Sequence, residues 1–483
     1  MIGAWPVRLL GVALALPSPA LAAGLAARDV AASVGLDYPN ILTLGQIPVL
    51  DVDGDGRLDV IVNHHARLPT VDGRHAGHWP VLRWDGSRFV TFDLLEDRPT
   101  MDRHGCAVAD FGQQGGDGRP DGLADLYCIT GANQGRCNKP DADTPEGAPC
   151  RYWSNELFLR NPDGTFPTSA DAAFVHARGW GVEGPYDRGR DVAVLDFDRN
   201  GLPDLAVANE GPSCVIETRN RLFRNTGGGF AEVDPTPVRG RQAATCVEAG
   251  NLDGNGWDDL VFCGRTTVIE YNRRCGDGVG GAADTRGAFG IKTFTNEGGT
   301  FTDASGSTAY RFPEAFSIKL RDVNRDGRVD LLFTTNGTLQ VWLNHDGGFP
   351  RQTWEYPIPT VADPYDHATP DDKFDGGGAD LEVGDVDLDG WPDIYLMHVD
   401  NEHHRDEMLL NDGGGTSFRK MAGDIPQPRR TGSFEGEPVH RGRGDSVTAI
   451  PNWKGTGRTA FLVFNGYRAN PGPVQLIEFH EAP

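Results

Sequence analysis

The sequence of 483 residues is poor in positive charge: 45 Lys and Arg are outnumbered by 69 Asp and Glu, which leaves a net charge of −24. Nucleic-acid binding needs basic surfaces, and no basic stretch offsets this acidity, so we expect no nucleic-acid partner. Beyond the first residues no apolar run is long enough to span a bilayer, so we expect no transmembrane segment. A nucleophile elbow, an HExxH motif and a phosphate-binding loop are also absent, which removes the signals of several enzyme classes.

Cysteine is scarce, with eight residues, and no two of them form a CxxC pair. A zinc site or a thioredoxin-type site is therefore disfavoured. An even number of cysteines in an exported chain favours disulfides, and we expect the local bridges Cys106–Cys128 and Cys137–Cys150. The remaining four leave two possibilities, which are Cys214–Cys246 with Cys263–Cys275, or Cys246–Cys263 with Cys214–Cys275.

The N-terminal segment has the features of an export signal. Arg8 precedes an apolar stretch, Leu9 to Leu16, and Ala20-Leu21-Ala22 supplies a small-x-small cleavage site. The apolar stretch is too short to cross a membrane. We therefore expect a signal peptide at residues 1–22, and a mature chain of residues 23–483 that is secreted or periplasmic.

Glycine is abundant, with 64 residues and no collagen period, which is typical of many turns and short strands. Several of these glycines belong to one nine-residue pattern, D-x-[DN]-x-[DN]-G-x-x-D. We number its copies as loops 1 to 6: Asp51–Asp59, Asp110–Asp125, Asp196–Asp204, Asn251–Asp259, Asp322–Asp330 and Asp385–Asp393. Loop 2 is stretched by a Gly/Gln insert and resumes at Asp121. Much of the acidic excess is thus placed at a fixed spacing, which solubility alone does not require.

A short apolar run lies on each side of every loop, as Ile47 to Leu50 and Val60 to Val62 do for loop 1. These β-branched or aromatic runs indicate buried strands. A second signature follows in most units, as in NRLFRNTGGGF at Asn220 to Phe230, where a strand, a Gly-rich turn and an aromatic residue succeed one another. Four strands per unit make one propeller blade. We predict an all-β fold, a seven-bladed β-propeller of four-stranded antiparallel blades, over residues 23–483.

A seventh unit keeps the loop spacing without the acids. Its loop 7, Asn452–Ala460, retains Gly457 at position six, and we expect it to bind no metal. Lys454 either places its ammonium at the position where the other loops are expected to hold the metal, or it is simply exposed. This unit ends at Val474 to Phe479 and lacks a fourth strand, whereas Ala27 to Leu36 resembles one. We predict that the mature N-terminus completes the last blade and closes the ring.

The loops have the chemistry of a calcium site. Ca²⁺ takes about six to eight oxygen ligands and favours carboxylates; residues at positions one, three and five of a tight loop turn inward, and glycine at six permits the bend. The acid at position nine reaches back across the loop. We predict about five or six Ca²⁺ ions. The predicted ligands are Asp51, Asp53, Asp55 and Asp59; Asp110, Asp117, Asp121 and Asp125; Asp196, Asp198, Asn200 and Asp204; Asn251, Asp253, Asn255 and Asp259; Asp322, Asn324, Asp326 and Asp330; and Asp385, Asp387, Asp389 and Asp393.

Two other interpretations compete with this one. An EF-hand shares positions one, three, five and six, but it needs Glu at position twelve and flanking helices; here position twelve is apolar or Cys and the flanks are strands, so we reject it. Asp-Gly and Asn-Gly also occur in ordinary hairpin turns, which is a weak explanation for six matched copies. Loops 1 and 6, with four acids each, should bind most strongly, and loop 4 most weakly.

The two linked motifs resemble those of the FG-GAP/VCBS repeat family, which includes the propeller of integrin α subunits, secreted bacterial proteins and cartilage acidic protein. The pairing of DxDxDGxxD with a later N-x-L-[FY]-x-N-x-G-x-G-x-F covers nearly all of the mature chain. The resemblance implies calcium at Asp51, Asp53, Asp55 and Asp59 and at the matching positions of later loops. The insert in loop 2 and the lost acids of loop 7 depart from the pattern.

In integrin-like propellers the calcium hairpins lie on one face, and partners usually bind the opposite face. The segments expected there are rich in His and Arg: His64, His65, Arg67 and His78 in the first unit, and His403, His404 and Arg405 in the sixth. We take these as candidate ligand-binding residues, and expect a monomeric binding or adhesion module for an extracellular glycan or protein. The alternatives are a polysaccharide lyase or hydrolase that uses His, Arg and Tyr on this face, and histidines that are merely solvated.

Overall fold

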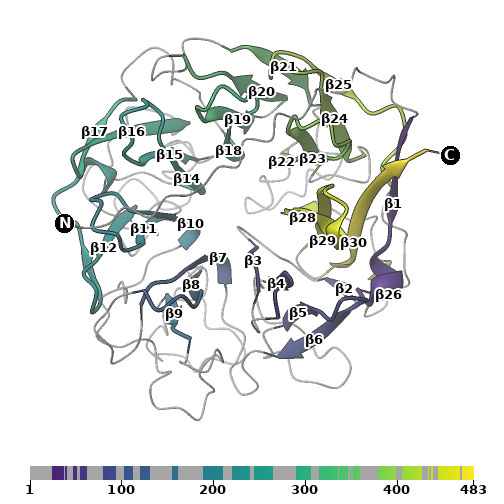
Figure 1. Cartoon of the computed structure of the whole chain (residues 1–483), viewed down its shortest axis with the longest axis horizontal. Helices are drawn as coiled ribbons and strands as arrows, with labels where there is room; N and C mark the ends of the chain where they lie inside the picture. Colours follow the sequence, from purple (N-terminus) through teal and green to yellow (C-terminus); the bar gives the residue numbers. More distant parts are fainter. Residues whose placement is uncertain are drawn as a thin grey trace, which may run out of the picture.

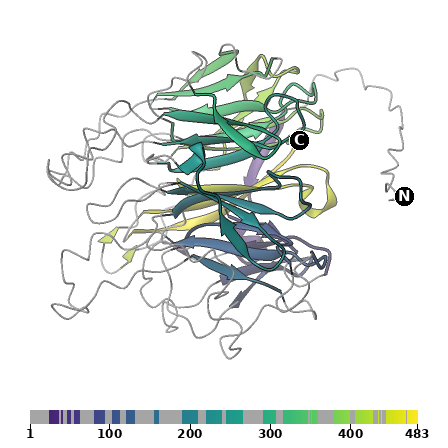
Figure 2. The ribbon, with the colours of Figure 1, turned by 90° about the vertical axis from the view of Figure 1, so that its left-hand side faces the viewer.

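The apolar runs around each acidic loop pair as antiparallel strands, and the resulting sheets stand side by side in a ring of seven blades (Figure 1). Seen from the side, the strands run along the axis of the ring, so the loops between them lie at its two ends (Figure 2). The computed structural model describes residues 24–36, 39–40, 47–51, 55–62, 80–93, 103–112, 120–130, 155–160, 189–209, 220–239, 244–264, 290–305, 315–335, 337–345, 349, 352–358, 379–398, 405–426, 433–434, 437–438, 444–467 and 470–482.

Blades 1 to 6 use their strands in chain order, from the axis outward. Blade 1 is β3 (Val49–Leu50), β4 (Asp59–Ile61), β5 (Pro80–Trp84) and β6 (Phe89–Asp93), and blade 2 is β7 (Arg103–Ala109), β8 (Asp125–Thr130) and β9 (Glu156–Phe158). Blade 3 is β10 (Gly189–Leu195), β11 (Asp204–Asn209), β12 (Arg221–Asn225) and β13 (Phe230–Glu232), and blade 4 is β14 (Cys246–Gly250), β15 (Asp259–Cys263), β16 (Ile291–Glu297) and β17 (Thr300–Asp303).

Blade 5 is β18 (Ser317–Arg321), β19 (Asp330–Thr334), β20 (Thr338–Trp342) and β21 (Trp354–Pro357), and blade 6 is β22 (Ala379–Gly384), β23 (Asp393–His398), β24 (Glu407–Asn411) and β25 (Phe418–Lys420). Blade 7 is β28 (Gly444–Ile450), β29 (Ala460–Tyr467), β30 (Asn470–Glu481) and the N-terminal β1 (Leu25–Asp29), and β2 (Pro39–Asn40) also pairs with β30. A separate hairpin joins β26 (Ser433–Phe434) and β27 (Glu437–Pro438), and the described helices are the short turns η1 (Ala31–Val34), η3 (Pro237–Arg239) and η5 (Trp453–Gly455). Every acidic loop connects the first and second strands of its blade, as predicted.

The N-terminal strand closes the ring. β1 runs antiparallel to β30, with Leu25 opposite Glu481 and Asp29 opposite Ile477 (Figure 1). The prediction that the mature N-terminus completes the last blade is confirmed, but the strand lies earlier than Ala27 to Leu36. It ends at Asp29 because the Asp29 carboxylate accepts the N–H of Ala31, at 3.0 Å, and so turns the chain into η1.

The hydrophobic core lies between neighbouring blades. Each large cluster of buried apolar side chains combines the facing sheets of two blades, as Leu339 of blade 5 and Leu396 of blade 6 do. The junction of blades 7 and 1 is rich in aromatic rings: Trp453 lies 4.8 Å from Trp84 and 5.8 Å from Phe89, centroid to centroid. Dispersion and burial therefore hold the ring at the point where the chain ends meet.

Two disulfides are present among the described residues. Cys106–Cys128 joins the first two strands of blade 2, as predicted, and Cys246–Cys263 joins those of blade 4. The latter bridge selects the second of the two pairings left open by the sequence. Cys137, Cys150, Cys214 and Cys275 lie outside the described residues. None of the helices in the described ranges has the length and apolarity that crossing a membrane requires.

The aromatic junction yields a prediction about stability. Replacing Trp453, which is 5% exposed, by Ala removes a large buried ring and should lower the free energy of unfolding by about 3–5 kcal/mol. Urea unfolding of W453A measures this loss. The surface variant Arg405→Ala, which breaks an exposed ion pair with Asp424, is the control and should change stability little. Equal effects of the two variants would refute the structural role of the ring.

Candidate metal loops

The first acid of loops 1, 3 and 5 organises the loop backbone. In loop 3, the Asp196 carboxylate accepts the N–H of Asn200 through one oxygen and that of Gly201 through the other, each at 3.0 Å. Asp51 and Asp322 accept the matching pair of N–H groups in loops 1 and 5. The loop backbone therefore curls around the acid at position one.

Loop 2 adopts this arrangement in spite of its insert. Asp110 accepts the N–H groups of Asp121 and Gly122, at 3.0 and 2.6 Å, and the Asp121 carboxylate accepts that of Leu123 at 2.9 Å. Asp110, Asp121 and Asp125 therefore occupy positions one, five and nine, as predicted. Asp117, proposed for position three, lies outside the described residues, as Asp53 of loop 1 does.

Two loop positions need a left-handed backbone. Glycine at position six has φ between 81° and 87° in all six loops, which explains why the motif demands it there. Position four is also left-handed, at φ 55° for Arg199, 57° for Arg325 and 67° for Leu388. Sequence reasoning missed this second bend, because only loops 1 and 4 have a glycine at position four (Gly54 and Gly254), whereas loops 3, 5 and 6 have Arg or Leu there.

The acid at position nine is the most buried member of each loop. Asp204 is 0% exposed, yet both carboxylate oxygens are bonded: one accepts the N–H of Phe197, at position two, and the other that of Asn225, at the end of the third strand. The equivalent aspartates Asp59, Asp125, Asp259, Asp330 and Asp393 are at most 1% exposed. Each of these acids therefore joins its loop to the third strand of its own blade.

Burial makes these carboxylates hard to ionise in the absence of a cation. It raises the pKa of Asp125 and Asp204 to about 7 and that of Asp393 to about 8, and the neighbouring loop carboxylates add to the rise. The pKa values of Asp259 and Asp330 are raised to about 6 for the same reason. A bound cation would relieve both the desolvation and the mutual repulsion of these acids.

Carboxylates converge in two of the loops. In loop 3, Asp196, Asp198 and Asp204 each offer an oxygen, and these oxygens lie within 4.8 Å of one another. Asp385, Asp387 and Asp393 do the same in loop 6. Three converging carboxylates are a donor set that suits a hard cation such as Ca²⁺. In loop 4 the side-chain oxygen of Asn251 is buried without a hydrogen-bond donor, so this position-one ligand also has room for a cation partner.

Among the described residues, arginine pairs with an acid in three of the loops. In loop 3, Arg224 pairs with Asp198 at position three, and in loops 1 and 5 an arginine pairs with the acid at position five. Arg57 lies 2.6 Å from the Asp55 carboxylate in loop 1, and Arg328 lies 2.9 Å from that of Asp326 in loop 5. Loop 6 carries Trp391 at the position of these arginines. The expected difference in strength between the sites stays a prediction; in loop 1 a metal would have to displace a guanidinium. Counting acids could not reveal this ion pair.

Loop 7 keeps the turn without the acids. Asn452 accepts the N–H of Gly457 at 2.8 Å, as the first acid does elsewhere, and Ala460 replaces the buried aspartate of position nine. The Lys454 ammonium lies 3.4 Å from the Glu478 carboxylate of β30. Lys454 is therefore exposed, as one of the two interpretations expected, and its ammonium pairs with the third strand of its own blade.

The second signature contains two asparagines with distinct contacts. The first, Asn220, accepts the N–H of Asn209 at the end of the second strand, at 3.0 Å. The second, Asn225, donates its amide to the carbonyl of Phe111, in loop 2 of the preceding blade, at 3.0 Å. In blade 3 the residue after position nine is Leu205, its partner on the third strand is Phe223, and Asn225 lies two places beyond that partner. We call the residue at this place in each blade the clamp residue. The Asn that recurs at the Gly-rich turn marks the clamp residue in the sequence. The sequence does not reveal that this Asn donates to a loop of the preceding blade.

The candidate ligand-binding residues are only partly described. His64, His65, Arg67, His78, His403 and His404 lie outside the described residues. Arg405 is exposed, and it pairs with Asp424 at 2.6 Å. At the same end of the ring His104 and His398 are buried, at 1% and 3% exposure, and the Arg190 guanidinium lies 2.5 Å from the His104 ring. These two histidines therefore brace the fold rather than face a ligand.

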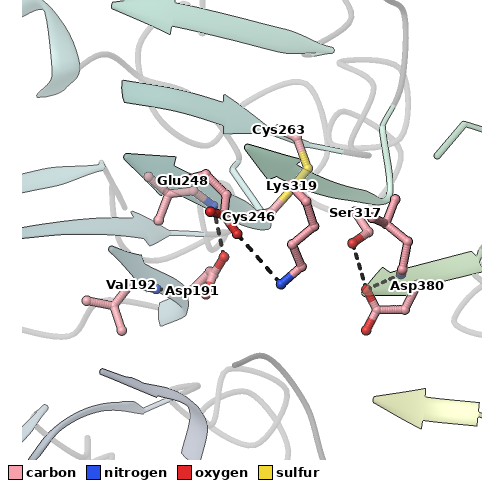
Figure 3. The surroundings of a disulfide bond; sticks show 10 residues. Asp191, Val192, Cys246, Glu248, Cys263, Ser317, Lys319 and Asp380 are labelled. Atoms are coloured by element: carbon pink, nitrogen blue, oxygen red, sulfur yellow. Dashed lines mark hydrogen bonds and ion pairs between the residues drawn. A yellow bond between two sulfur atoms is a disulfide. The ribbon is translucent and has the colours of Figure 1, made fainter. Parts of the chain in front are cut away.

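A polar network that the sequence did not reveal lines the innermost strands of blades 3 to 6. Lys319 lies 2.6 Å from Glu382 and 3.6 Å from Glu248, and Ser317 donates to Asp380 at 2.6 Å. Figure 3 shows Lys319 directed at Glu248 beside the Cys246–Cys263 disulfide. Asp191 accepts the N–H of Val247 on the next blade at 2.9 Å. The network ties adjacent blades together at the ring axis.

Part of the chain matches a known family of repeats. The FG-GAP-like repeat model matches residues 196–262 and 322–396, which hold loops 3 to 6. No curated protein is significantly similar to the chain. Similar solved structures include BBS1N in complex with ARL6DN, soaked with lead (9% identity, TM-score 0.45, 92% of this chain and 97% of that one). Another is an Agrocybe aegerita lectin described as recognising non-reducing terminal N-acetylglucosamine (14% identity, TM-score 0.44, 93% of each chain).

The raised pKa values predict how pH affects the metal-free protein. The unfolded chain releases these protons near pH 4, whereas the folded chain holds them to about pH 6–8. The folded state therefore binds more protons across this window, and its stability should fall as pH rises from 5 to 8. Urea unfolding in excess chelator at the two pH values measures the change. D393N, which cannot titrate, should show a shallower decline, and stability that increases towards pH 8 would contradict the prediction.

Proposed function

Because the chain is a seven-bladed β-propeller that carries FG-GAP-like repeats, we propose that it is a secreted or periplasmic calcium-binding module that recognises an extracellular glycan or protein. The observation that carries the calcium proposal is the convergence of three carboxylates in loop 3 and again in loop 6. Both loops have the same backbone bend and the same buried acid at position nine. The two disulfides are in keeping with an oxidising compartment.

Calcium has a structural part in this proposal. When bound, the ion supplies positive charge to acids that are otherwise buried together, and it binds the folded chain but not the unfolded one. The side chains at positions one, three, five and nine would hold it. Asp393 and its equivalents already fix their orientation through two backbone N–H groups, so the carboxylate that would face the ion is preorganised.

We place the binding of the glycan or protein ligand at the end of the ring opposite the metal loops. The second strands run away from the metal loops, because each is antiparallel to the first strand of its blade. The segments that follow them carry the His-rich and Arg-rich sequences of units 1 and 6, and Arg405 is their described member. Exposed arginine is well suited to bind carboxylate or sulfate groups and sugar hydroxyls. A rigid ring that presents variable loops is a common architecture for binding.

Calorimetry can test the calcium proposal. Titration of chelator-treated protein with CaCl₂ should show about five or six ions bound and a melting temperature that rises with calcium. The double variant Asp385→Asn, Asp387→Asn should lose one of the tight sites. It should still fold, because Asn already occupies the same positions in loops 4 and 5 (Asn251 and Asn324). D424N, altered at a carboxylate that is 75% exposed, is the matched control. Absence of calcium binding by the wild-type protein would end the proposal.

A glycan array tests recognition. The calcium-loaded protein should bind a restricted set of extracellular glycans or proteins, and chelation should weaken binding because the scaffold loosens. Arg405→Ala should reduce binding, whereas D424N controls for the loss of its ion pair. Turnover of an acidic polysaccharide would instead favour an enzyme. Absence of any bound glycan or extracellular protein would leave the recognition half of the proposal without support.

A further inference from the structure

The buried aspartates of neighbouring blades are joined by hydrogen bonds. Between blades 5 and 6 the connection has three links: Val323 donates its N–H to Asp330 at 2.9 Å, the Asn411 side chain donates to the Val323 carbonyl at 2.9 Å, and the Asn411 N–H donates to Asp393 at 2.9 Å. Val323 occupies position two of loop 5 and is therefore flanked by the predicted ligands Asp322 and Asn324. One asparagine thus connects the predicted metal ligands of two loops.

The same three links recur at each junction from blade 2 to blade 6. Asn225 contacts Phe111 O and Asp204, Asn296 contacts Phe197 O and Asp259, and Asn344 contacts Leu252 O and Asp330, all at 2.6–3.0 Å. The position-two N–H of each loop in turn donates to that loop's buried aspartate. The path Asp125–Asp204–Asp259–Asp330–Asp393 is therefore unbroken.

The clamp changes with the loops that it joins. Arg160 holds the clamp place in blade 2, where its N–H donates to Asp125 and its guanidinium donates to the Asp51 carbonyl at 2.8 Å. The two junctions of blade 7, whose loop has no acids, have aromatic residues at this place instead. Trp84 packs on Trp453, and Phe479 lies in one apolar cluster with Val386. A polar clamp residue is present at every junction of two acidic loops. At the junction of blades 6 and 7 the clamp place holds Phe479, and the Val386 carbonyl at position two of loop 6 instead accepts the guanidinium of Arg458 from loop 7.

We propose that the clamps couple the calcium loops of blades 2 to 6, so that an ion in one loop raises the affinity of its neighbours. The proposal rests on the calcium-binding function proposed above. An ion held by positions one and three fixes the peptide group at position two, which is the acceptor of the next blade's clamp. The clamp then holds the aspartate at position nine of its own loop in its binding orientation. A second ion that binds this loop would therefore have fewer groups left to order, and its affinity would be higher.

The aromatic junctions have a complementary role. They pack blade 7 on both neighbours, and blade 7 is where the N-terminal β1 closes the ring. Loop 7 has no predicted metal ligand of its own, and it contacts loop 6 through the Thr459 N–H, which donates to the Asp385 carbonyl. Loss of calcium should therefore loosen blades 2 to 6 while the closure stays intact. The amides of the β28–β29 hairpin, paired from Gly444 to Ile450, provide an internal reference whose protection should not depend on calcium.

Amide hydrogen exchange in a calcium titration tests the coupling. In the variant Asp385→Asn, Asp387→Asn, which disables loop 6, the calcium concentration that half-protects the peptides containing Asn296 and Asn344 should rise about fivefold or more. In D424N it should stay at the wild-type value. An unchanged midpoint at Asn344 and Asn296 in the loop 6 variant would show independent sites and overturn the coupling.

Asn344→Ala removes the clamp between blades 4 and 5 and provides a second test. Calorimetry should then show two separate groups of sites with lower cooperativity, whereas wild-type cooperativity would overturn the proposal. Should N344A not fold, the loop 6 variant decides alone, because its substitutions are ones that loops 4 and 5 already accommodate. Wild-type protein that binds no calcium refutes the proposed function; wild-type protein that binds calcium at independent sites refutes only the coupling.

Discussion

A buried carboxylate at position nine is the interaction on which each acidic blade depends. It connects the loop between the first two strands to the end of the third strand, through two backbone N–H groups that would otherwise lack acceptors. A charged or half-protonated group in this place is costly to bury unless it is bonded or neutralised. Six blades carry the same buried carboxylate. A positive charge would therefore be favourable at six places near the loop end of the ring.

Much of the fold was readable from the sequence because the unit repeats. A short apolar run, a turn and a second run specify a hairpin locally, and repetition of the hairpin specifies the ring. The blade count, the ring closure and the Cys106–Cys128 bridge could therefore be predicted. The exact start of the closing strand could not, since it depends on a side-chain contact of Asp29 that ends the strand.

The loop sites were less predictable than the fold. The motif identifies the acids but not their partners, and Arg57 and Arg328 occupy acids that Ca²⁺ would need. Both arginines lie only two residues from the acid that they bind, so a spacing rule could have found them. The clamp asparagines and the axial network around Lys319 bond to other blades, and contacts between distant parts of the chain have no local sequence signal.

Blade 7 is the one blade that lacks the buried aspartate at position nine. The closing strands β1 and β30 come from opposite ends of the described chain, so noncovalent contacts hold this pair together. Blade 7 replaces the buried aspartate by Ala460 and the polar clamp by Phe479, and it packs Trp453 against Trp84 and Phe89. Apolar contacts of this kind need neither a metal nor a particular protonation state. The closing blade is therefore held by apolar contacts that involve no predicted metal ligand of loop 7.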